Sequence, residues 1–343
     1  MGKTGLVILG IESSCDETAA AIYSGSDGLL SNVIASQTIH EQFGGVVPEL
    51  ASRAHHKKIN NTVTQALDEA AITMEAVDEI AVTQGPGLMG SLLVGLSFAK
   101  GLALAHKLPL RGINHIDAHM YAAFIEYKPS FPFLALIVSG GHTQIVQVNG
   151  FQEHKILGKT RDDAAGEAFD KIGKMLGLPY PAGPYMDKRA KVGDPNAYDF
   201  PQAMKNKGLD FSFSGLKTSV LYHIQDISED QREAYLEEHL NDLCASVSRA
   251  IVEVLVAKLK RAMKETGISE VIVAGGVAAN SMLRDRVSSM VEGQMGGHLY
   301  IPSMVYCTDN AAMIAITGYL ESEDGVDSAT GLSIRPYTRI KTG

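Results

Sequence analysis

The chain has 343 residues, which is enough for two domains that each bury their own core. Hydrophobic residues make up 45% of it and charged residues 20%, a composition typical of globular proteins and not of disordered or fibrous ones. The net charge of −9 excludes a surface that is basic overall. A nucleic-acid substrate would therefore have to contact a local basic patch or be held partly by a partner protein.

Cysteine usage and the apolar segments indicate where the protein works. The three cysteines, Cys15, Cys244 and Cys307, include no CxxC pair, which predicts free thiols and a cytoplasmic protein. No signal or transit peptide is recognisable, because "MGKTGLVILG" runs directly into a strand-like segment. The most apolar predicted helix, residues 90–106, is interrupted by Lys100 and is shorter than a spanning helix needs, so we expect no membrane association.

The first third of the chain predicts three strands followed by alternating helices and strands. The strands are recognised as apolar runs bounded by glycine turns, and Pro48 suits the first turn of the first helix. The predicted strands cover 6–13, 17–24, 29–37, 79–87 and 110–114, and the predicted helices cover 47–70, 88–107 and 115–127.

The rest of the chain repeats this order. Predicted strands cover 131–141, 142–150, 153–160, 270–276 and 298–303, and predicted helices cover 162–178, 232–267, 280–292 and 308–321. A doubled βββαβαβα unit is the plan of the ribonuclease-H-like, actin-like ATPase superfamily, which also contains Hsp70 and the sugar kinases. We therefore expect an α/β protein with two such domains facing a central nucleotide or metal cleft. The expected domains are 1–128, completed by the C-terminal segment, and 129–343, with an irregular insertion at about 178–230.

A histidine pair follows the last strand of the first half, in "INHIDAH" at 113–119. Positions i and i+4 lie on one face of a helix, so His115 and His119 could bind the same ion. The spacing is equally compatible with two buried, hydrogen-bonded histidines. Asp309 occupies the matching position in the second half, and pseudo-twofold symmetry would bring it to the pair across the cleft. Two imidazoles and one carboxylate suit Fe²⁺ or Zn²⁺ better than Mg²⁺.

Asp309 has a structural interpretation as well. An acidic residue at a helix N-terminus is favoured by the helix dipole, with Thr308 as the cap. A zinc peptidase is the tempting alternative for the histidines, but its HExxH motif needs a glutamate where this chain has Ile116. Asp117 would point away from the pair. The peptidase interpretation therefore lacks its general base.

Turns between the first two strands stand at equivalent places in the two halves, in "IESSCDET" (11–18) and in "VSGGHTQ" (138–144), which contains two glycines. Gly140 and Gly141 would let backbone N–H groups approach a phosphate, although a plain hairpin turn has the same sequence. "AGGVAAN" (274–280) joins a strand to a helix whose N-terminus could face a nucleotide. Its Asn280 could cap that helix or bind a ligand hydroxyl.

Carboxylates also accompany these turns. Asp16 and Glu17 lie in the first turn, where they could enter the cleft or simply form the turn. Asp163, Glu167 and Asp170 form one acidic helical stripe, which is usually solvated but would bind ribose hydroxyls or a cation if it faced the cleft. Nothing near Cys15 is suited to lower the pKa of its thiol, so we treat it as structural.

Together these segments resemble the bacterial TsaD family, the tRNA N6-adenosine threonylcarbamoyltransferases, formerly called O-sialoglycoprotein endopeptidases. The resemblance runs from about residue 8 to 336. It is carried by nine segments in chain order: "GIESSCDETAAAI", "GGVVPELASRAH", "QGPGLMGSLLVG", "NHIDAHMYA", "VSGGHTQ", "DDAAGEAFDK", "LDFSFSGLKT", "AGGVAAN" and "CTDNAAM".

The resemblance implies transfer of the threonylcarbamoyl group of threonylcarbamoyl-AMP to N6 of adenosine 37, in tRNAs reading codons that begin with A, with release of AMP. It implies one iron (zinc is an alternative) on His115, His119 and Asp309. It also implies TsaB and TsaE partners and a TsaC-type synthase as supplier. The adenylate-binding residues that it implies are Ile137, Val138, Ser139, Gly140, Gly141, Asp170, Gly183, Asp187 and Asn280.

The chemistry of the implied reaction suits these residues. An adenine amine must lose a proton as it attacks, so Asp16, or alternatively Glu17, is a reasonable base. For tRNA contact the chain offers basic residues at 52–58, in the insertion and at 335–341, each of which could equally be a solvated surface. The two phenylalanines of "FSFSGLK" (211–217) could belong to a mobile lid or could pack beneath the insertion.

Other functions of the same fold remain open from the sequence. A metabolite kinase that phosphorylates a small acid or sugar with ATP would share the fold and the nucleotide cleft. It would hold Mg²⁺ with carboxylates and would give the histidine pair no role. A chaperone-type ATPase would bind ATP and change shape without an acceptor substrate.

Overall fold

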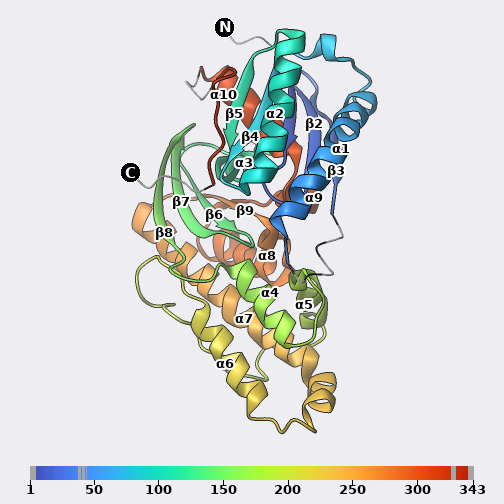
Figure 1. Ribbon diagram of the computed structural model, residues 1–343. Coiled ribbons are helices and arrows are strands. Elements are labelled where there is room, and N and C mark those ends of the chain that lie inside the picture. The colour runs from blue at the N-terminus through green and yellow to red at the C-terminus, as the bar shows by residue number, and fades with distance from the viewer. Residues whose placement is uncertain (1–4, 38–39, 41–42, 44, 326–329, 339–343) are drawn as a thin grey trace. The chain divides into compact units, whose positions relative to one another are not determined.

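The computed structural model describes residues 5–37, 40, 43, 45–325 and 330–338 (Figure 1). The chain divides into two compact units, and each is described by itself. The first combines Met1–Lys128 with Pro302–Gly343, and the second is Pro129–Ile301. Residues 302–343 thus group with the N-terminal residues, although they follow the second unit in the sequence.

The first unit contains a five-stranded sheet in the order β3-β2-β1-β4-β5. The β1–β2 and β2–β3 pairs are antiparallel, whereas β1–β4 and β4–β5 are parallel. Parallel pairs need a crossover, and the helices between them supply it. The strands are β1 (Val7–Glu12), β2 (Thr18–Ser24), β3 (Gly28–Ala35), β4 (Glu79–Gly85) and β5 (Leu110–Asn114), and the helices are α1 (Pro48–Glu69), α2 (Met89–His106), α3 (His115–Tyr121), α9 (Met304–Cys307) and α10 (Ala311–Glu323).

The second unit repeats the same sheet. Its order is β10-β9-β6-β7-β8, with β6–β7 and β7–β8 antiparallel and β6–β9 and β9–β10 parallel. The duplicated βββαβαβα plan is therefore confirmed. The strands are β6 (Phe133–Val138), β7 (Thr143–Gly150), β8 (Glu153–Lys159), β9 (Glu270–Ala274) and β10 (His298–Tyr300), and the helices are α4 (Ala165–Met175), α5 (Ala182–Ala190), α6 (Ser214–Gln225), α7 (Arg232–Thr266) and α8 (Ser281–Ser288).

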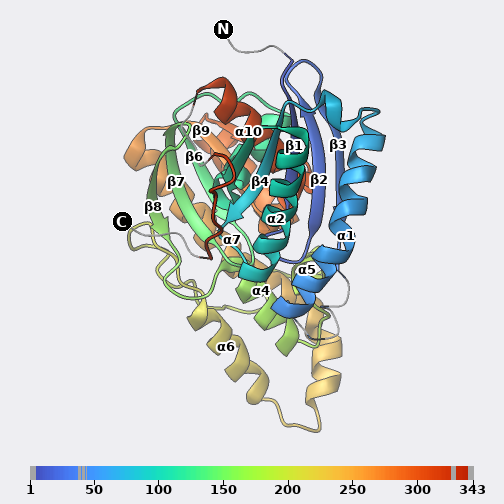
Figure 2. The same ribbon diagram turned by 45° about the horizontal axis from the view of Figure 1, so that its top comes forward.

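Side chains of β1 alternate between two apolar cores in the first unit. Leu9 and Ile11 pack with residues of α1 and α2, whereas Ile8 packs with α10 and α3 on the other face. Between them, Gly10 lets α10 approach the sheet closely, since a Cβ there would lie 2.6 Å from the Ala311 carbonyl oxygen. Figure 2 shows α1 and α2 lying side by side along the sheet, in agreement with their mutual contacts.

One helix among the described residues, α2, is long and apolar enough to span a membrane by length and composition alone. Its inner face carries Leu92, Leu96 and Ala99, which are fully or almost fully buried, and it packs on β4 and α1. A helix at the core of a folded domain passes the same test. The helix is therefore weak evidence for a membrane span.

The insertion predicted at 178–230 is more regular than expected, because it contains α5 and α6. Phe211 and Phe213 are buried, with 0% and 1% of their surface exposed, so they pack under the insertion in this structure. Asp162 fixes the segment after them by accepting hydrogen bonds from the N–H groups of Phe213 (2.8 Å) and Ser214 (3.2 Å). Of the two alternatives that the sequence left open for these phenylalanines, the structure shows packing beneath the insertion, where aromatic side chains bury a large apolar area.

Candidate metal centre and nucleotide-binding residues

Helix α3 places the two histidines on one face. Asn114 caps the helix by accepting hydrogen bonds from the backbone N–H groups of Ile116 (2.8 Å) and Asp117 (3.2 Å). His115 is the first helical residue and His119 follows one turn later. Both side chains are almost fully buried, and their rings meet edge to face with centroids 4.7 Å apart. The i, i+4 spacing therefore brings the two imidazoles together.

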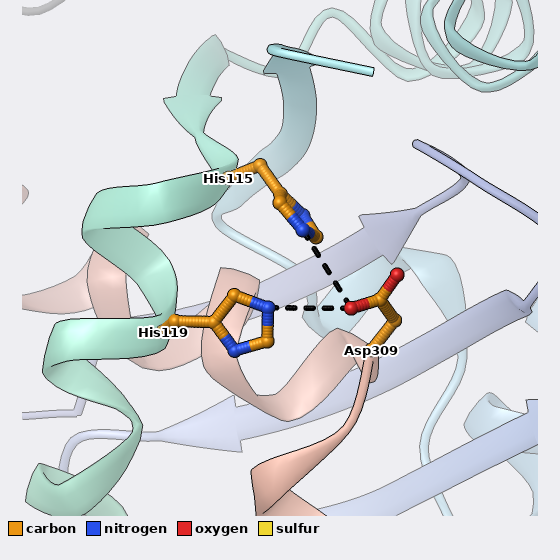
Figure 3. Close-up of side chains that lie close together, drawn as sticks. All are labelled: His115, His119 and Asp309. Atoms are coloured by element: carbon orange, nitrogen blue, oxygen red, sulfur yellow. Dashed lines mark hydrogen bonds and ion pairs between the residues drawn. The ribbon is translucent and has the colours of Figure 1, made fainter. Parts of the chain in front are cut away.

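Asp309 completes a cluster of three possible metal ligands (Figure 3). Its Oδ1 atom lies 3.2 Å from Nε2 of His119 and 3.6 Å from Nε2 of His115. One ligand atom from each residue lies within 4.8 Å of the others. Asp309 lies just before α10. The cap of this helix is Asn310, whose Oδ1 atom accepts a hydrogen bond from the Met313 N–H (3.0 Å). Thr308 is therefore not the cap, contrary to the structural interpretation.

The cluster forms inside the first unit. Asp309 was expected to reach the histidines from the second half of the chain, across a cleft between two domains. Instead the chain returns to the first unit at residue 302, and α10 packs on β1, β2 and α3. Gly10 permits this close packing, so the carboxylate and the imidazoles share one fold unit.

A fourth side chain, Glu12, supports the cluster and was not identified from the sequence. Glu12 is completely buried at the end of β1, and its Oε2 atom lies 3.2 Å from Nδ1 of His115. The carboxylate also accepts hydrogen bonds from the Thr83 hydroxyl (2.6 Å) and the Ser14 N–H (2.5 Å). A carboxylate that holds one ring nitrogen fixes the tautomer and leaves Nε2 free as a ligand.

The electrostatics of the cluster favour a positive charge within it. Burial lowers the pKa of His115, but the charges of Asp309 and Glu12 and the hydrogen bond to Glu12 outweigh burial and raise this pKa to about 9. Burial raises the pKa of Glu12, yet the charge and hydrogen bond of His115 bring this pKa below its ordinary value. The site therefore attracts a cation, either a proton or a metal ion.

The donor set fits a borderline transition metal. Two imidazole nitrogens and one carboxylate oxygen suit Fe²⁺ or Zn²⁺ and leave further coordination positions open. His115 has the carboxylate partner on its second nitrogen that metal-binding histidines usually have. The buried Nδ1 atom of His119 has no hydrogen-bond partner within the described part of the chain. These residues thus form a possible metal site, and they do not distinguish iron from zinc.

The β1–β2 turn carries both predicted catalytic carboxylates beside this cluster. Burial, followed by the charges of Asp309 and Asp16 and a hydrogen bond with Asp16, raises the pKa of Glu17 to about 9. Glu17 is therefore protonated at neutral pH and is a poor general base. Burial and the same neighbouring carboxylates raise the pKa of the Cys15 thiol far above its ordinary value. Such a thiol is a poor nucleophile.

Residues predicted to bind the adenylate lie in the second unit. Ile137 and Val138 end β6 and are buried, and a turn follows in which the Ser139 N–H donates to the His142 carbonyl (2.8 Å). A side chain at Gly140 or Gly141 would meet no described atom within 4 Å, so there is free space beside the turn. Gly275, at φ +91°, packs against the Val138 carbonyl, where a Cβ would lie 2.5 Å from its oxygen.

The remaining predicted binding residues are linked by hydrogen bonds at the start of α5 and α8. Asp170 accepts a bond from the Ala182 N–H (2.8 Å) and another from the Gly183 N–H, while burial raises its pKa. Asp187 accepts from both the N–H (2.9 Å) and the hydroxyl (2.8 Å) of Ser281. Asn280 caps α8 by accepting from the Leu283 N–H (3.0 Å). These hydrogen bonds tie α4, α5 and α8 together.

Other predicted groups have structural partners. Asp163 pairs with Lys171 (2.8 Å) and Lys217 (3.1 Å), and Glu167 pairs with Lys171 (2.7 Å), so this part of the acidic stripe is neutralised. Lys205 pairs with Glu253 (3.2 Å).

The candidate tRNA-binding segments are only partly exposed. In 52–58, His55 is completely buried, whereas Arg53, His56 and Lys57 are exposed. Arg335 is exposed as well, but 339–341 lie outside the described residues.

Comparison with known proteins identifies the family. The sequence model of TsaD, described as tRNA N6-adenosine threonylcarbamoyltransferase, matches residues 28–316. The chain belongs to the TsaD family. A tRNA N6-adenosine threonylcarbamoyltransferase of Christiangramia forsetii is 54% identical over 323 residues, which cover 93% of this chain and 94% of the relative. One of Salinibacter ruber is 52% identical over 338 residues, covering 98% of this chain and all (100%) of the relative.

Solved structures with the same fold are distant in sequence. Full-length HypF in its phosphate- and nucleotide-bound form superimposes with a TM-score of 0.61 at 13% identity, covering 96% of this chain and 47% of HypF. Component A of the (R)-2-hydroxyglutaryl-CoA dehydratase of Acidaminococcus fermentans superimposes with a TM-score of 0.55 at 12% identity. The match covers 92% of this chain and 99% of component A. These likenesses confirm the actin-like ATPase fold and carry no functional argument.

Membership in TsaD also decides between the functions left open by the sequence. The family's activity is the transfer of a threonylcarbamoyl group to N6 of adenosine in tRNA, so the chain is an enzyme of tRNA modification. The kinase alternative receives no support from any of the relatives described above.

Proposed function

We propose that this chain takes the threonylcarbamoyl group from threonylcarbamoyl-AMP and joins it to N6 of adenosine 37, in tRNAs that read codons beginning with A. The observation that carries this proposal is the family match over residues 28–316, together with the cluster of His115, His119 and Asp309. The kinases considered above would need carboxylates around Mg²⁺ and would give that cluster no role.

His115, His119 and Asp309 would hold one Fe²⁺, with Zn²⁺ as the alternative. Bound there, such an ion would supply a Lewis acid able to polarise the carbonyl of the donor. Glu12 keeps the proton of His115 on Nδ1, because its carboxylate can only accept a hydrogen bond there.

Asp16 is the group we assign to accept the proton that the adenine amine loses as it attacks. Asp16 is preferred to Glu17 because the pKa of Glu17 is raised to about 9, which leaves Glu17 protonated at neutral pH. A protonated carboxyl can donate a hydrogen bond to the neighbouring Asp16 or to substrate, but it cannot act as the base.

The adenylate part of the donor is assigned to the second unit, which we propose is one actin-like domain, the first unit being the other. The residues proposed to bind it are Ile137, Val138, Ser139, Gly140, Gly141, Asp170, Gly183, Asp187 and Asn280. Two features support the assignment: the free space beside Gly140 and Gly141, and the N-terminus of α8, which Asn280 caps. Backbone N–H groups at such turns stabilise phosphate charge.

The chain is also proposed to work in the cytoplasm with TsaB-like and TsaE-like partners and a TsaC-type synthase that supplies the donor. The net charge of −9 and the ion pairs made by Lys205 and Lys217 support a need for partners in holding tRNA. Both lysines are already paired with carboxylates and are less available for phosphate contacts.

The test is a reconstituted transfer reaction. The chain, its presumed partners, unmodified tRNA and threonylcarbamoyl-AMP are incubated, and the nucleosides of the tRNA are analysed. We expect the modified adenosine to appear with the unsubstituted chain and to be lost with His115→Ala. Phosphorylation of a small acid or sugar by ATP, with unmodified tRNA left unchanged, would overturn the proposal. Full transfer activity in His115→Ala would show that the proposed metal site has no part in the reaction.

A further inference from the structure

His55 is a buried histidine that the proposed reaction does not use. It lies on α1 within the segment 52–58, and none of its surface is exposed, whereas the adjacent His56 faces solvent. Its two ring nitrogens have partners on the β1–β2 turn and at the first residue of β2. Nδ1 lies 2.8 Å from the Thr18 hydroxyl, and Nε2 lies 3.0 Å from the Cys15 carbonyl oxygen.

The two partners define the tautomer of His55. A carbonyl oxygen can only accept, so Nε2 carries the hydrogen and donates it to Cys15. Nδ1 then accepts from the Thr18 hydroxyl. The ring is neutral in this arrangement, which agrees with the direction of its pKa shift, since burial lowers the pKa of His55.

These bonds span the residues that carry the proposed base. Cys15 immediately precedes Asp16, and Thr18 immediately follows Glu17, so the imidazole joins the two ends of the acidic pair. The same turn is held from α2, where the Ser91 hydroxyl donates to the Cys15 carbonyl (3.1 Å). A turn fixed from two helices offers its carboxylates in one orientation.

We propose that His55 is a positioning residue: it connects Cys15 to Thr18 and thereby fixes the orientation of Asp16, the proposed base, and of the neighbouring Glu17. The catalytic effect of this inference rests on the proposed function. The rigidity of the turn can be measured even if that function is wrong. A residue that acts by orienting a catalytic group affects turnover more than substrate binding.

The experiment compares four variants with the unsubstituted chain. His55→Ala removes both bonds, whereas His55→Gln keeps an N–H donor for Cys15 and an oxygen acceptor for Thr18. Asn61→Ala changes an exposed residue of the same helix, outside the segment 52–58. Ser31→Ala removes a buried bond from the Ser31 hydroxyl to the Ala66 carbonyl (2.7 Å) at the other end of α1, and so controls for a general loss of stability.

Two readouts are taken from each protein. Amide hydrogen exchange is followed in peptides covering 11–18, and kcat and KM of the reconstituted transfer are measured for tRNA and for the donor. We expect His55→Ala to speed exchange in this turn and to lower kcat about tenfold to hundredfold, with little change in either KM. His55→Gln should recover most of kcat, and Asn61→Ala and Ser31→Ala should keep it.

Each outcome decides the proposal. Unchanged exchange at 11–18 in His55→Ala would overturn it, whatever the activity. Faster exchange with an unchanged kcat would overturn the positioning role, as would an equal loss of kcat in Ser31→Ala at matched stability. If no protein of the series transfers the group, the proposed function fails, and the exchange measurement alone still tests the connection that His55 makes.

Discussion

Glu12→Gln is the substitution that most sharply tests how the metal centre is built. The carboxylate accepts three hydrogen bonds, from the Ser14 N–H (2.5 Å), the Thr83 hydroxyl (2.6 Å) and Nδ1 of His115 (3.2 Å). An amide has only one oxygen for these donors. If its NH₂ group faces His115, that ring must accept at Nδ1, and its proton moves to Nε2, the atom assigned to the metal.

The expected loss follows from that tautomer change and from the lost negative charge. Removing the group that supports a metal-binding histidine typically weakens metal affinity about 10- to 100-fold, or about 1.4–2.7 kcal/mol. We expect a loss of this size for Zn²⁺ binding to purified Glu12→Gln, measured by isothermal titration calorimetry. His115→Ala should lose more, because it removes a ligand itself.

A matched control separates metal binding from folding. Glu79 is another buried carboxylate of the same sheet, and it accepts bonds from Arg111 (2.7 Å) and Ser322 (2.7 Å). Glu79→Gln should therefore lower stability without changing Zn²⁺ affinity. Unchanged affinity in Glu12→Gln, or equal losses in the two variants, would refute the reasoning.

Three further predictions follow from other contacts. Because the pKa of metal-free His115 is raised to about 9, Zn²⁺ must displace its proton at pH 7. Affinity should then rise with pH up to about 9, with proton release seen by calorimetry in buffers of different ionisation enthalpy; binding without release at pH 7 would contradict this. Asn310→Ala removes the cap of α10 and should lower the free energy of unfolding by about 1 kcal/mol in urea, whereas an unchanged midpoint would refute the capping role. Lys258→Met leaves three carbonyls of 204–208 without their buried ammonium donor and should cost about 3 kcal/mol or more, with faster proteolysis of that turn. Lys260→Met, which loses one bond to a glutamine side chain, is its control and should resist proteolysis like the unsubstituted chain.

Local patterns in the sequence predicted the parts of the site that depend on short-range geometry. The spacing of His115 and His119 is enough to place both rings on one face of a helix. The three-strand start of each half and the turns after β1 and β6 likewise follow from alternating apolar runs. These features need no knowledge of distant contacts.

The remaining parts of the site depend on long-range packing, which local sequence patterns do not encode. Asp309 was matched to the histidines by symmetry, but it reaches them because α10 packs back onto the first sheet. Glu12 stood in the sequence as a charged residue ending a buried strand, a place where a carboxylate needs partners. His55 shares a helical stripe with Ala51, Ile59 and Val63, all buried, and that spacing could have separated it from the exposed basic residues around it.

The most direct test of the metal centre is anomalous diffraction at the metal edge from crystals of the chain loaded with Fe²⁺ or Zn²⁺. The account predicts one peak bonded to Nε2 of His115, Nε2 of His119 and the carboxylate of Asp309, at about 2.0–2.2 Å from each. A loaded crystal whose only peak lies elsewhere, or whose ion is bound without Asp309, would contradict it.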